Sequence, residues 1–253
     1  MCSIGVMLGS PEIDVLKRIN DYQSHRGPDG SNIWHDDKCG FAHNRLAIVD
    51  VSGSIQPIIS EEGVVLIHNG EIYNHKKIKK DNPMYSWKTK GDSESILALH
   101  SRYTKKSSFE QIKETSIASG LLVAKGFDAI DNPATRHKEW VSKLDGVWGF
   151  ALWDSKCNEL IICRDPMGVK PLIRTIAGNS LLVSSELKAF SAHSDYISKF
   201  DYNALNLRLA YEYPLDRSTL IEGVSQVGAG VIETWSLDIN DRPVLTGISK
   251  YTS

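Results

Sequence analysis

The chain has 253 residues, of which 41% are hydrophobic and 24% are charged, and its formal net charge at pH 7 is −2. This composition is that of an ordinary globular protein, and the small net charge gives no electrostatic reason to expect nucleic acid or a membrane surface as a partner. No apolar run approaches the ~20 residues that span a bilayer, and no basic segment precedes an apolar stretch as in a secretory signal. We therefore expect a cytoplasmic protein.

The cysteines give no indication of a metal or redox centre. Cys2, Cys39, Cys157 and Cys163 have no CxxC spacing, so neither a zinc ribbon nor a redox dithiol is predicted. Residues 35–39 contain His, Asp and Cys side chains, but they fall where a turn between strands is expected. We predict a solvated loop there, with no metal site.

The second residue is a candidate nucleophile. Cys2 follows Met1, and a small side chain at position 2 favours removal of the initiator methionine. Cys2 would then carry a thiol, with an unperturbed pKa near ~8.5, and a free α-amine, near ~7.7, on one residue. The alternative is an ordinary cysteine at the start of a buried strand.

The first fifth of the chain predicts strands separated by a helix and a turn. Residues 3–8 are strand-like, and residues 14–23 have the apolar spacing of a helix. Two glycines and a proline within residues 26–30 force a turn. Residues 41–51 are strand-like but contain Arg45, which either extends to solvent or holds an anion.

Polar residues follow the next predicted strand, residues 64–67. Residues 68–71 come directly after it, and polar residues beside Gly70 at a strand end can present an amide side chain and a backbone N–H to a ligand. A helix is predicted over residues 91–103, with Asp92 as either its N-terminal cap or a functional acceptor.

The second half of the chain predicts mainly strands. Residues 147–153 and 160–163 form a hairpin, and residues 180–185 and 231–237 are further strands. Strands that outnumber helices and pair as hairpins favour an α+β fold with antiparallel sheets over a parallel one. Without an internal repeat or a linker, we expect residues 1–253 to form a single domain.

Eight motifs occur in a definite order along the chain. They are Met1–Ile4, Arg26–Gly30, Asn44–Asp50, Gln56–Pro57, Asn69–Asn74, Gly91–Glu94, Leu144–Gly146 and Arg164–Leu172. This ordered set resembles class II glutamine amidotransferases, and within them the N-terminal glutaminase domain of glutamine-dependent asparagine synthetases. The resemblance covers residues 1 to about 103 and 144 to about 237. It implies an N-terminal-nucleophile hydrolase fold, a four-layer αββα sandwich of two antiparallel sheets, and we expect no cofactor.

The resemblance also implies a binding site for L-glutamine. Glutamine carries a carboxylate, an ammonium and a neutral amide, so a selective site needs a cation, an anion and donors for an oxyanion. Arg45 would bind the α-carboxylate and Asp92 the α-ammonium. By the same resemblance, Glu71 and the backbone of Ile48 and Val49 would complete the pocket.

Catalysis would begin with attack of the Cys2 sulfur on the side-chain amide carbon. The Asn69 amide and the Gly70 backbone N–H would stabilise the oxyanion. The α-amine of Cys2 would take the thiol proton and pass one to the departing ammonia, and water would then hydrolyse the thioester. Arg26 and His68 are left without an assigned role.

Two features depart from the family. Residues 104–143 are longer than the usual connection and rich in apolar residues, which predicts a helical insertion packed on the sandwich or, alternatively, a surface for a partner protein. No phosphate-binding loop of the GxxxxGK[ST] or SGGxDS kind occurs up to Ser253, so ATP chemistry is not predicted. We expect the ammonia to pass to a separate synthetase subunit. Whether the protein forms a homodimer is left open by the sequence.

Other interpretations stay open as well. The same fold could supply ammonia to amino-sugar or purine-precursor synthesis, although residues 44–50 favour the synthetase-like branch. A catalytically silent glutamine-sensing or scaffolding subunit would bind glutamine without turnover. A purely structural domain would not bind glutamine at all.

Overall fold

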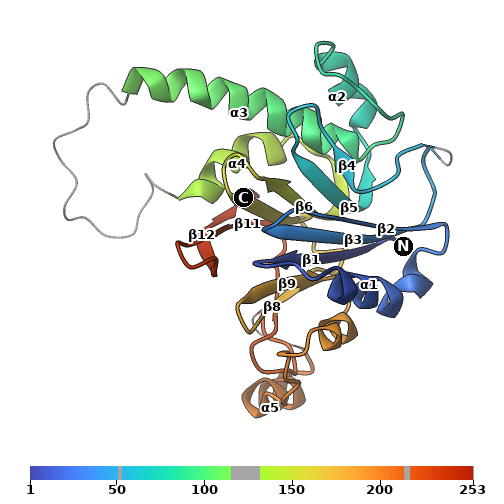
Figure 1. Ribbon diagram of the computed structural model, residues 1–253, viewed down its shortest axis with the longest axis vertical. Coiled ribbons are helices and arrows are strands. Elements are labelled where there is room, and N and C mark those ends of the chain that lie inside the picture. The colour runs from blue at the N-terminus through green and yellow to red at the C-terminus, as the bar shows by residue number, and fades with distance from the viewer. Residues whose placement is uncertain (51–52, 115–131, 214–216, 253) are drawn as a thin grey trace.

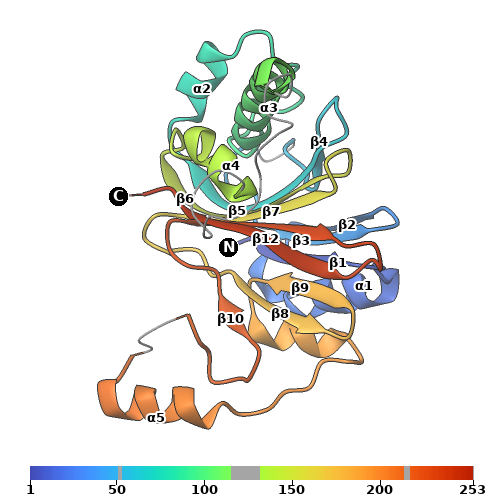
Figure 2. The ribbon, with the colours of Figure 1, turned by 90° about the vertical axis from the view of Figure 1, so that its left-hand side faces the viewer.

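The computed structural model describes residues 1–50, 53–114, 132–213 and 217–252. Within these residues the longer strands form two six-stranded antiparallel sheets that lie face to face (Figures 1 and 2). Helices cover the outer face of each sheet. The four-layer αββα sandwich implied by the resemblance is therefore confirmed.

The first sheet has the order β10-β8-β9-β1-β3-β2. Its central strand β1 pairs with β3 and with β9, and every residue of β1 and β3 is buried. Ser3 pairs with Asn44 at one end of this sheet, which brings Cys2 next to Arg45. The bounds are β1 (Ser3–Leu8), β2 (Gly30–His35), β3 (Cys39–Arg45), β8 (Ile173–Ala177), β9 (Ser180–Ser184) and β10 (Ser225–Gln226).

The second sheet has the order β12-β11-β7-β6-β5-β4. Strand β5 pairs with β6 along its whole length, from Val65 opposite Trp153 to Ile72 opposite Gly146. The strand expected to end before His68 therefore continues to Ile72. The bounds are β4 (Ile58–Ile59), β5 (Val65–Ile72), β6 (Gly146–Asp154), β7 (Glu159–Arg164), β11 (Val231–Leu237) and β12 (Pro243–Lys250).

Helices α1 and η2 cover the first sheet, and α3 and α4 cover the second, with α2 beside α3 (Figures 1 and 2). Helix α5 extends away from the sandwich (Figure 2). The bounds are α1 (Ile13–Tyr22), η1 (Ser24–Arg26), α2 (His75–Asp81), α3 (Glu94–Glu114), α4 (Pro133–Val141), η2 (Leu187–Ala192) and α5 (Tyr202–Tyr211).

Apolar side chains fill the three spaces between the four layers. Ile67 and Trp153 belong to the cluster between the sheets, and Phe150 belongs to the cluster under α3 and α4. On the other side, Leu16 of α1 packs with Phe190 of η2. Each such side chain contributes about 1.5–3 kcal/mol by leaving water. The strand ends that carry the site are thus held by a rigid core.

The segment expected to be a helical insertion is helical at both of its described ends. Helix α3 continues to Glu114 rather than ending near residue 103, and α4 begins at Pro133, where Asn132 accepts a hydrogen bond from Ala134 N at 3.1 Å. Trp140 of α4 is buried. Residues 115–131, the centre of the expected insertion, lie outside the described residues.

No helix in residues 1–50, 53–114, 132–213 or 217–252 has the length and apolar character needed to cross a bilayer. The four cysteines are free thiols. In the predicted turn at residues 35–39, Asp36 Oδ1 accepts hydrogen bonds from Lys38 N at 2.9 Å and Cys39 N at 2.7 Å. This carboxylate therefore closes the turn between β2 and β3.

Candidate active site

One pocket at the edge of the sandwich contains every residue that the sequence assigned to the site. These are Cys2, Arg45, Ile48, Val49, Asn69, Gly70, Glu71 and Asp92, and Ser54, Gln56, His68, Ser93 and Lys170 also line it. The Met1 side chain forms part of the wall. The cavity that these residues line has a volume of about 60 Å³.

The Cys2 thiol is half-buried and faces the loop after β3. Its Sγ accepts a hydrogen bond from Leu46 N at 3.4 Å and lies 3.7 Å from Leu46 O. Burial raises the pKa of this thiol, and the Leu46 backbone and the terminal ammonium only partly offset that effect. The thiol is therefore protonated at neutral pH, and a reaction at sulfur needs a base.

Arg26 fixes the first two residues of the chain. Its Nε donates to Cys2 O at 3.1 Å, its Nη1 donates to Glu186 Oε1 at 3.0 Å, and its carbonyl accepts from the Met1 ammonium at 2.9 Å. Burial would raise the pKa of Glu186, but hydrogen bonds from Arg26 and His25 hold it below its ordinary value. The sequence left Arg26 undecided, and the structure makes it the anchor of Cys2.

Arg45 is buried, with 8% of its surface exposed, so it does not extend to solvent. Its Nη2 donates to Asp50 O at 2.7 Å and to Val49 O at 3.5 Å. Asp29 holds the same loop by accepting a hydrogen bond from Ala47 N at 2.8 Å. The loop after β3 therefore curls around the guanidinium group.

Asn69 lines the pocket and carries an unpaired buried donor. Its side chain is 1% exposed, and its Nδ2 has no hydrogen-bond partner among the described residues. The next residue must be glycine, because a Cβ on Gly70 would lie 2.1 Å from Val147 O. A buried donor left unpaired costs about 1–3 kcal/mol, so this arrangement awaits an acceptor.

Asp92 connects the start of α3 to β5. Its Oδ2 accepts a hydrogen bond from Ile72 N at 2.7 Å, and its side chain is buried. Helix α3 begins two residues later, at Glu94. The cap interpretation placed this side chain on the first turn of its own helix. In the structure it binds the neighbouring strand instead.

His68, Gln56 and Ser93 form a buried network that sequence reasoning missed. Gln56 Oε1 accepts from His68 N at 2.5 Å, and Gln56 Nε2 donates to His68 O at 3.1 Å. The ring Nδ1 of His68 lies 2.9 Å from Ser93 Oγ. Gln56 and Ser93 belong to the ordered motifs, and that was the available signal for them.

The loop after β7 brings Lys170 to the pocket. Asp165 Oδ1 accepts from Met167 N at 3.1 Å and from Val169 N at 2.9 Å, and its Oδ2 accepts from Lys170 N at 3.0 Å. Arg164 Nε donates to Lys170 O at 2.7 Å. Arg164 and Asp165 therefore have a structural role, since both side chains bind the backbone of this loop.

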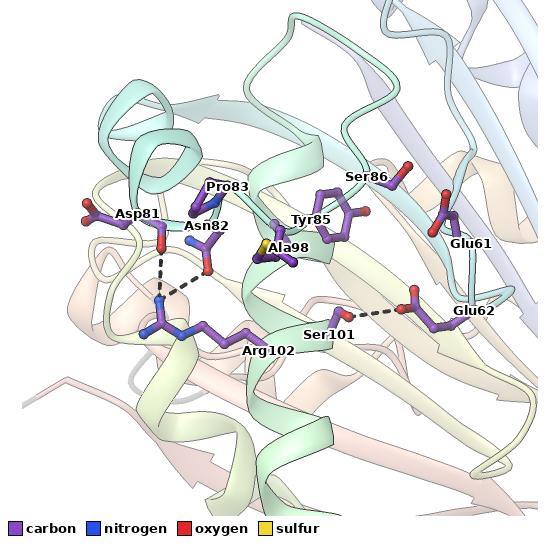
Figure 3. Close-up of a pocket in the computed structure, with 11 residues that line it drawn as sticks. Glu61, Glu62, Asp81, Asn82, Pro83, Tyr85, Ser86, Ala98, Ser101 and Arg102 are labelled. Atoms are coloured by element: carbon purple, nitrogen blue, oxygen red, sulfur yellow. Dashed lines mark hydrogen bonds between the residues drawn. The ribbon is translucent and has the colours of Figure 1, made fainter.

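A larger cavity of about 350 Å³ lies between α3 and the segments around residues 62 and 83 (Figure 3). Arg102 Nη1 donates to Asp81 O at 3.3 Å and to Asn82 Oδ1 at 3.2 Å, and Ser101 donates to Glu62 Oε1 at 3.2 Å. Among the described residues, no cysteine, histidine or unpaired amide lines this cavity. The chemistry assigned to the sequence motifs therefore belongs to the smaller pocket.

Comparison with solved structures supports the fold. Glutamine phosphoribosylpyrophosphate amidotransferase from B. subtilis, complexed with ADP and GMP, superposes with a TM-score of 0.61 at 18% identity, over 99% of this chain and 49% of that chain. A structure described as the allosteric regulatory enzyme of purine biosynthesis gives a TM-score of 0.62, with the same identity and coverage. At this identity the likeness concerns the fold alone.

Sequence relatives define the family. Asparagine synthetase [glutamine-hydrolyzing] 3 of Bacillus subtilis (strain 168) is 32% identical over 198 residues, which are 77% of this chain and 27% of the relative. The Zea mays asparagine synthetase is 31% identical over 76% of this chain and 28% of its own length. The chain thus spans less than a third of these relatives. The model of the glutamine amidotransferase domain matches residues 1–113 and 134–243. The chain therefore belongs to the class II glutamine amidotransferases.

Proposed function

We propose that this protein hydrolyses the side-chain amide of L-glutamine to glutamate and ammonia through a thioester on Cys2. The observation that carries the proposal is the buried, unpaired Nδ2 of Asn69, beside Gly70 and in the same pocket as the Cys2 thiol. An oxyanion formed in this pocket would supply the acceptor that the nitrogen lacks. One such donor typically contributes about 3 kcal/mol of transition-state stabilisation.

Removal of Met1 is part of the proposal. With Met1 in place this residue occupies part of the pocket wall, and the nitrogen of Cys2 is an amide without basicity. Removal would enlarge the pocket and leave the α-amine of Cys2 beside a thiol whose pKa is raised by burial. That amine would be the base that the protonated thiol needs.

Arg45 and Asp92 would bind the two charged ends of the substrate. The guanidinium of Arg45 would hold the α-carboxylate, and the Oδ1 of Asp92 would accept from the α-ammonium while Oδ2 stays bonded to Ile72 N. Glu71 and the backbone of the loop at residues 48–49 would complete the rim.

The proposed reaction proceeds in two steps. Cys2 Sγ bonds to the amide carbon as its proton passes to the α-amine, and the oxyanion binds Asn69 Nδ2 and Gly70 N. The C–N bond then breaks, and the departing nitrogen takes the proton from the amine and leaves as ammonia. Water, deprotonated by the same amine, attacks the thioester and releases glutamate and the free thiol.

The ammonia would be used by a synthetase. The relatives at about 30% identity are named asparagine synthetases, which favours an asparagine-synthetase-like acceptor. We propose that the acceptor is a separate synthetase subunit. Copurification followed by an assay of glutamine-dependent product formation tests this point independently of glutamine hydrolysis.

Intact mass spectrometry tests the glutaminase proposal directly. The untagged protein is weighed before and after treatment with a diazo-ketone analogue of glutamine. We expect a mass lacking Met1 and one adduct on Cys2 that excess glutamine prevents, together with ammonia release that Cys2→Ala abolishes. Loss of Met1 without an adduct or ammonia release would contradict the proposal.

A second candidate function depends on retention of Met1. Its side chain lines the pocket, and its Sδ lies 3.8 Å from Lys170 Nζ. A protein that retained Met1 would lack the base, which fits a catalytically silent sensing or scaffolding subunit. A retained Met1 in the native protein, with no ammonia release, would select this candidate.

A further inference from the structure

His68 lines the pocket and has a buried ring nitrogen without a hydrogen-bond partner among the described residues. Among the described residues that line this pocket, two buried side-chain nitrogens lack a hydrogen bond: Asn69 Nδ2 and His68 Nε2. The proposed oxyanion accounts for the first but not for the second. An unpaired buried polar atom costs about 1–3 kcal/mol, so its presence at a binding site indicates a partner that arrives with the ligand.

The His68 ring has a fixed direction. Its side chain is buried, its Nδ1 lies 2.9 Å from Ser93 Oγ, and its backbone N–H and carbonyl both bond to Gln56. The unpaired Nε2 lies 2.9 Å from the position that a Cβ on Gly70 would occupy. Nε2 therefore lies against Gly70, while the other ring nitrogen contacts Ser93, the residue after Asp92.

The α-ammonium group of the substrate has more hydrogen-bond donors than Asp92 alone can accept. An α-ammonium carries three N–H bonds, whereas Asp92 has one carboxylate oxygen already engaged with Ile72 N. The inference requires the neutral tautomer with its proton on Nδ1, in which Nδ1 donates to Ser93 Oγ and Nε2 is an acceptor. Burial lowers the pKa of His68, and this effect outweighs Asp92, which raises it. Nearby Lys170 also lowers the pKa, so the ring is neutral at pH 7.

We propose that His68 Nε2 accepts a hydrogen bond from the α-ammonium of glutamine, beside Asp92, with Ser93 orienting the ring. This inference rests on the proposed glutamine site and assigns a second acceptor to its ammonium end. His68 is thereby a specificity residue, which makes the pocket select ligands that carry a free α-amino group.

A pair of ligands isolates this contact. 4-Carbamoylbutanoate is glutamine without its α-amino group, and the Cys2→Ala variant binds either ligand without forming a thioester. Calorimetric titration gives the dissociation constant of each ligand for Cys2→Ala and for Cys2→Ala/His68→Asn. Asparagine keeps a polar atom near the Nδ1 position, which can still meet Ser93, but has none near Nε2.

We expect His68→Asn to weaken glutamine binding by about 10-fold or more, the range for a hydrogen bond to a charged group, and to change the affinity for 4-carbamoylbutanoate by less than about twofold. Equal weakening of both ligands, or of neither, would overturn the inference. His100→Asn is the matched control, because His100 is also a buried histidine with an unpaired Nε2 but does not line the pocket. It should leave both affinities unchanged.

Two further variants keep the test decisive if His68→Asn does not fold. His68→Gln places an amide near the Nε2 position and should restore part of the preference for glutamine. Ser93→Ala removes the group that orients the ring and should weaken glutamine selectively. If Cys2→Ala itself binds no glutamine and the native protein releases no ammonia, the proposed function fails. If glutamine binds and only the selective loss is missing, this inference alone fails.

Discussion

The carboxylate of Asp92 accepts a hydrogen bond from the backbone N–H of Ile72 at 2.7 Å, which joins the start of α3 to the end of β5. Through this bond the residue proposed for the ammonium end of glutamine is tied to the strand that carries Asn69 and Gly70, proposed for the amide end. The spacing between the two ends of the site is thus fixed by one buried contact.

Asp92→Asn separates binding from folding. Asparagine keeps an oxygen for Ile72 N but removes the negative charge, so we expect a 10- to 100-fold lower kcat/KM for glutamine, mainly through KM, since a hydrogen bond to a charged group contributes about 1.5–3 kcal/mol. Steady-state kinetics and a melting temperature within a few degrees of the native value check this. An unchanged KM would exclude Asp92 from substrate binding.

Asn69→Ala tests the proposed oxyanion donor. The Nδ2 atom has no partner in the described residues, so its removal breaks no hydrogen bond among them. The free energy of unfolding should therefore fall by little more than the effect of a small cavity. We expect kcat to fall about 10²- to 10³-fold with little change in KM. A matched loss of kcat and stability would instead indicate a structural role.

Arg26→Met should loosen the N-terminal residues. It should also remove the part of the free energy of unfolding that depends on ionised Glu186 and that is lost in acid. The variant loses the bonds to Cys2 O and Glu186. Glu186 has a pKa below its ordinary value, so its contribution is present above the unfolded pKa of about 4.3 and disappears as pH falls through the folded value. Urea unfolding gives the free energy of unfolding of the native protein and of the variant. The difference between these two free energies should be larger at pH 7 than near pH 3. A pH-independent difference would contradict this account.

His100 should make the protein less stable in mild acid. Burial, with His137 acting in the same direction, lowers its pKa to about 4, whereas an unfolded histidine has a pKa near ~6.5. Between these values the unfolded chain binds the extra proton, so stability is fully present above about pH 6.5 and is lost as pH falls toward 4. In His100→Phe, the free energy of unfolding measured with urea should change less with pH over this interval. His35→Phe, at an exposed position, should leave the slope unchanged.

Much of the fold followed from local patterns. The apolar spacing of residues 14–23 corresponds to α1, and the hairpin expected around residues 154–158 joins β6 to β7. Short elements such as β10 and the exposed helix α5 were missed, because they bury few apolar residues and so leave no periodic signal.

The end of β5 shows where local reasoning failed. Polar residues and a glycine after Ile67 have the appearance of a strand terminus, yet pairing with β6 continues to Ile72. Backbone hydrogen bonds to a neighbouring strand are non-local, so the sequence around Asn69 could not reveal them. The consequence is functional, because a strand holds Asn69 and Gly70 more rigidly than a loop would.

The sequence by itself determined which chemical groups are present and in what order: a cysteine at position 2, an arginine at the end of a strand, an Asn-Gly pair and an aspartate before a helix. These follow from residue type and motif order, which do not depend on long-range contacts. Only the tertiary structure decided which groups share a pocket and which nitrogens are left unpaired. Arg26 and His68 acquire meaning there, because burial and hydrogen-bond partners are set by residues that lie far apart in the chain.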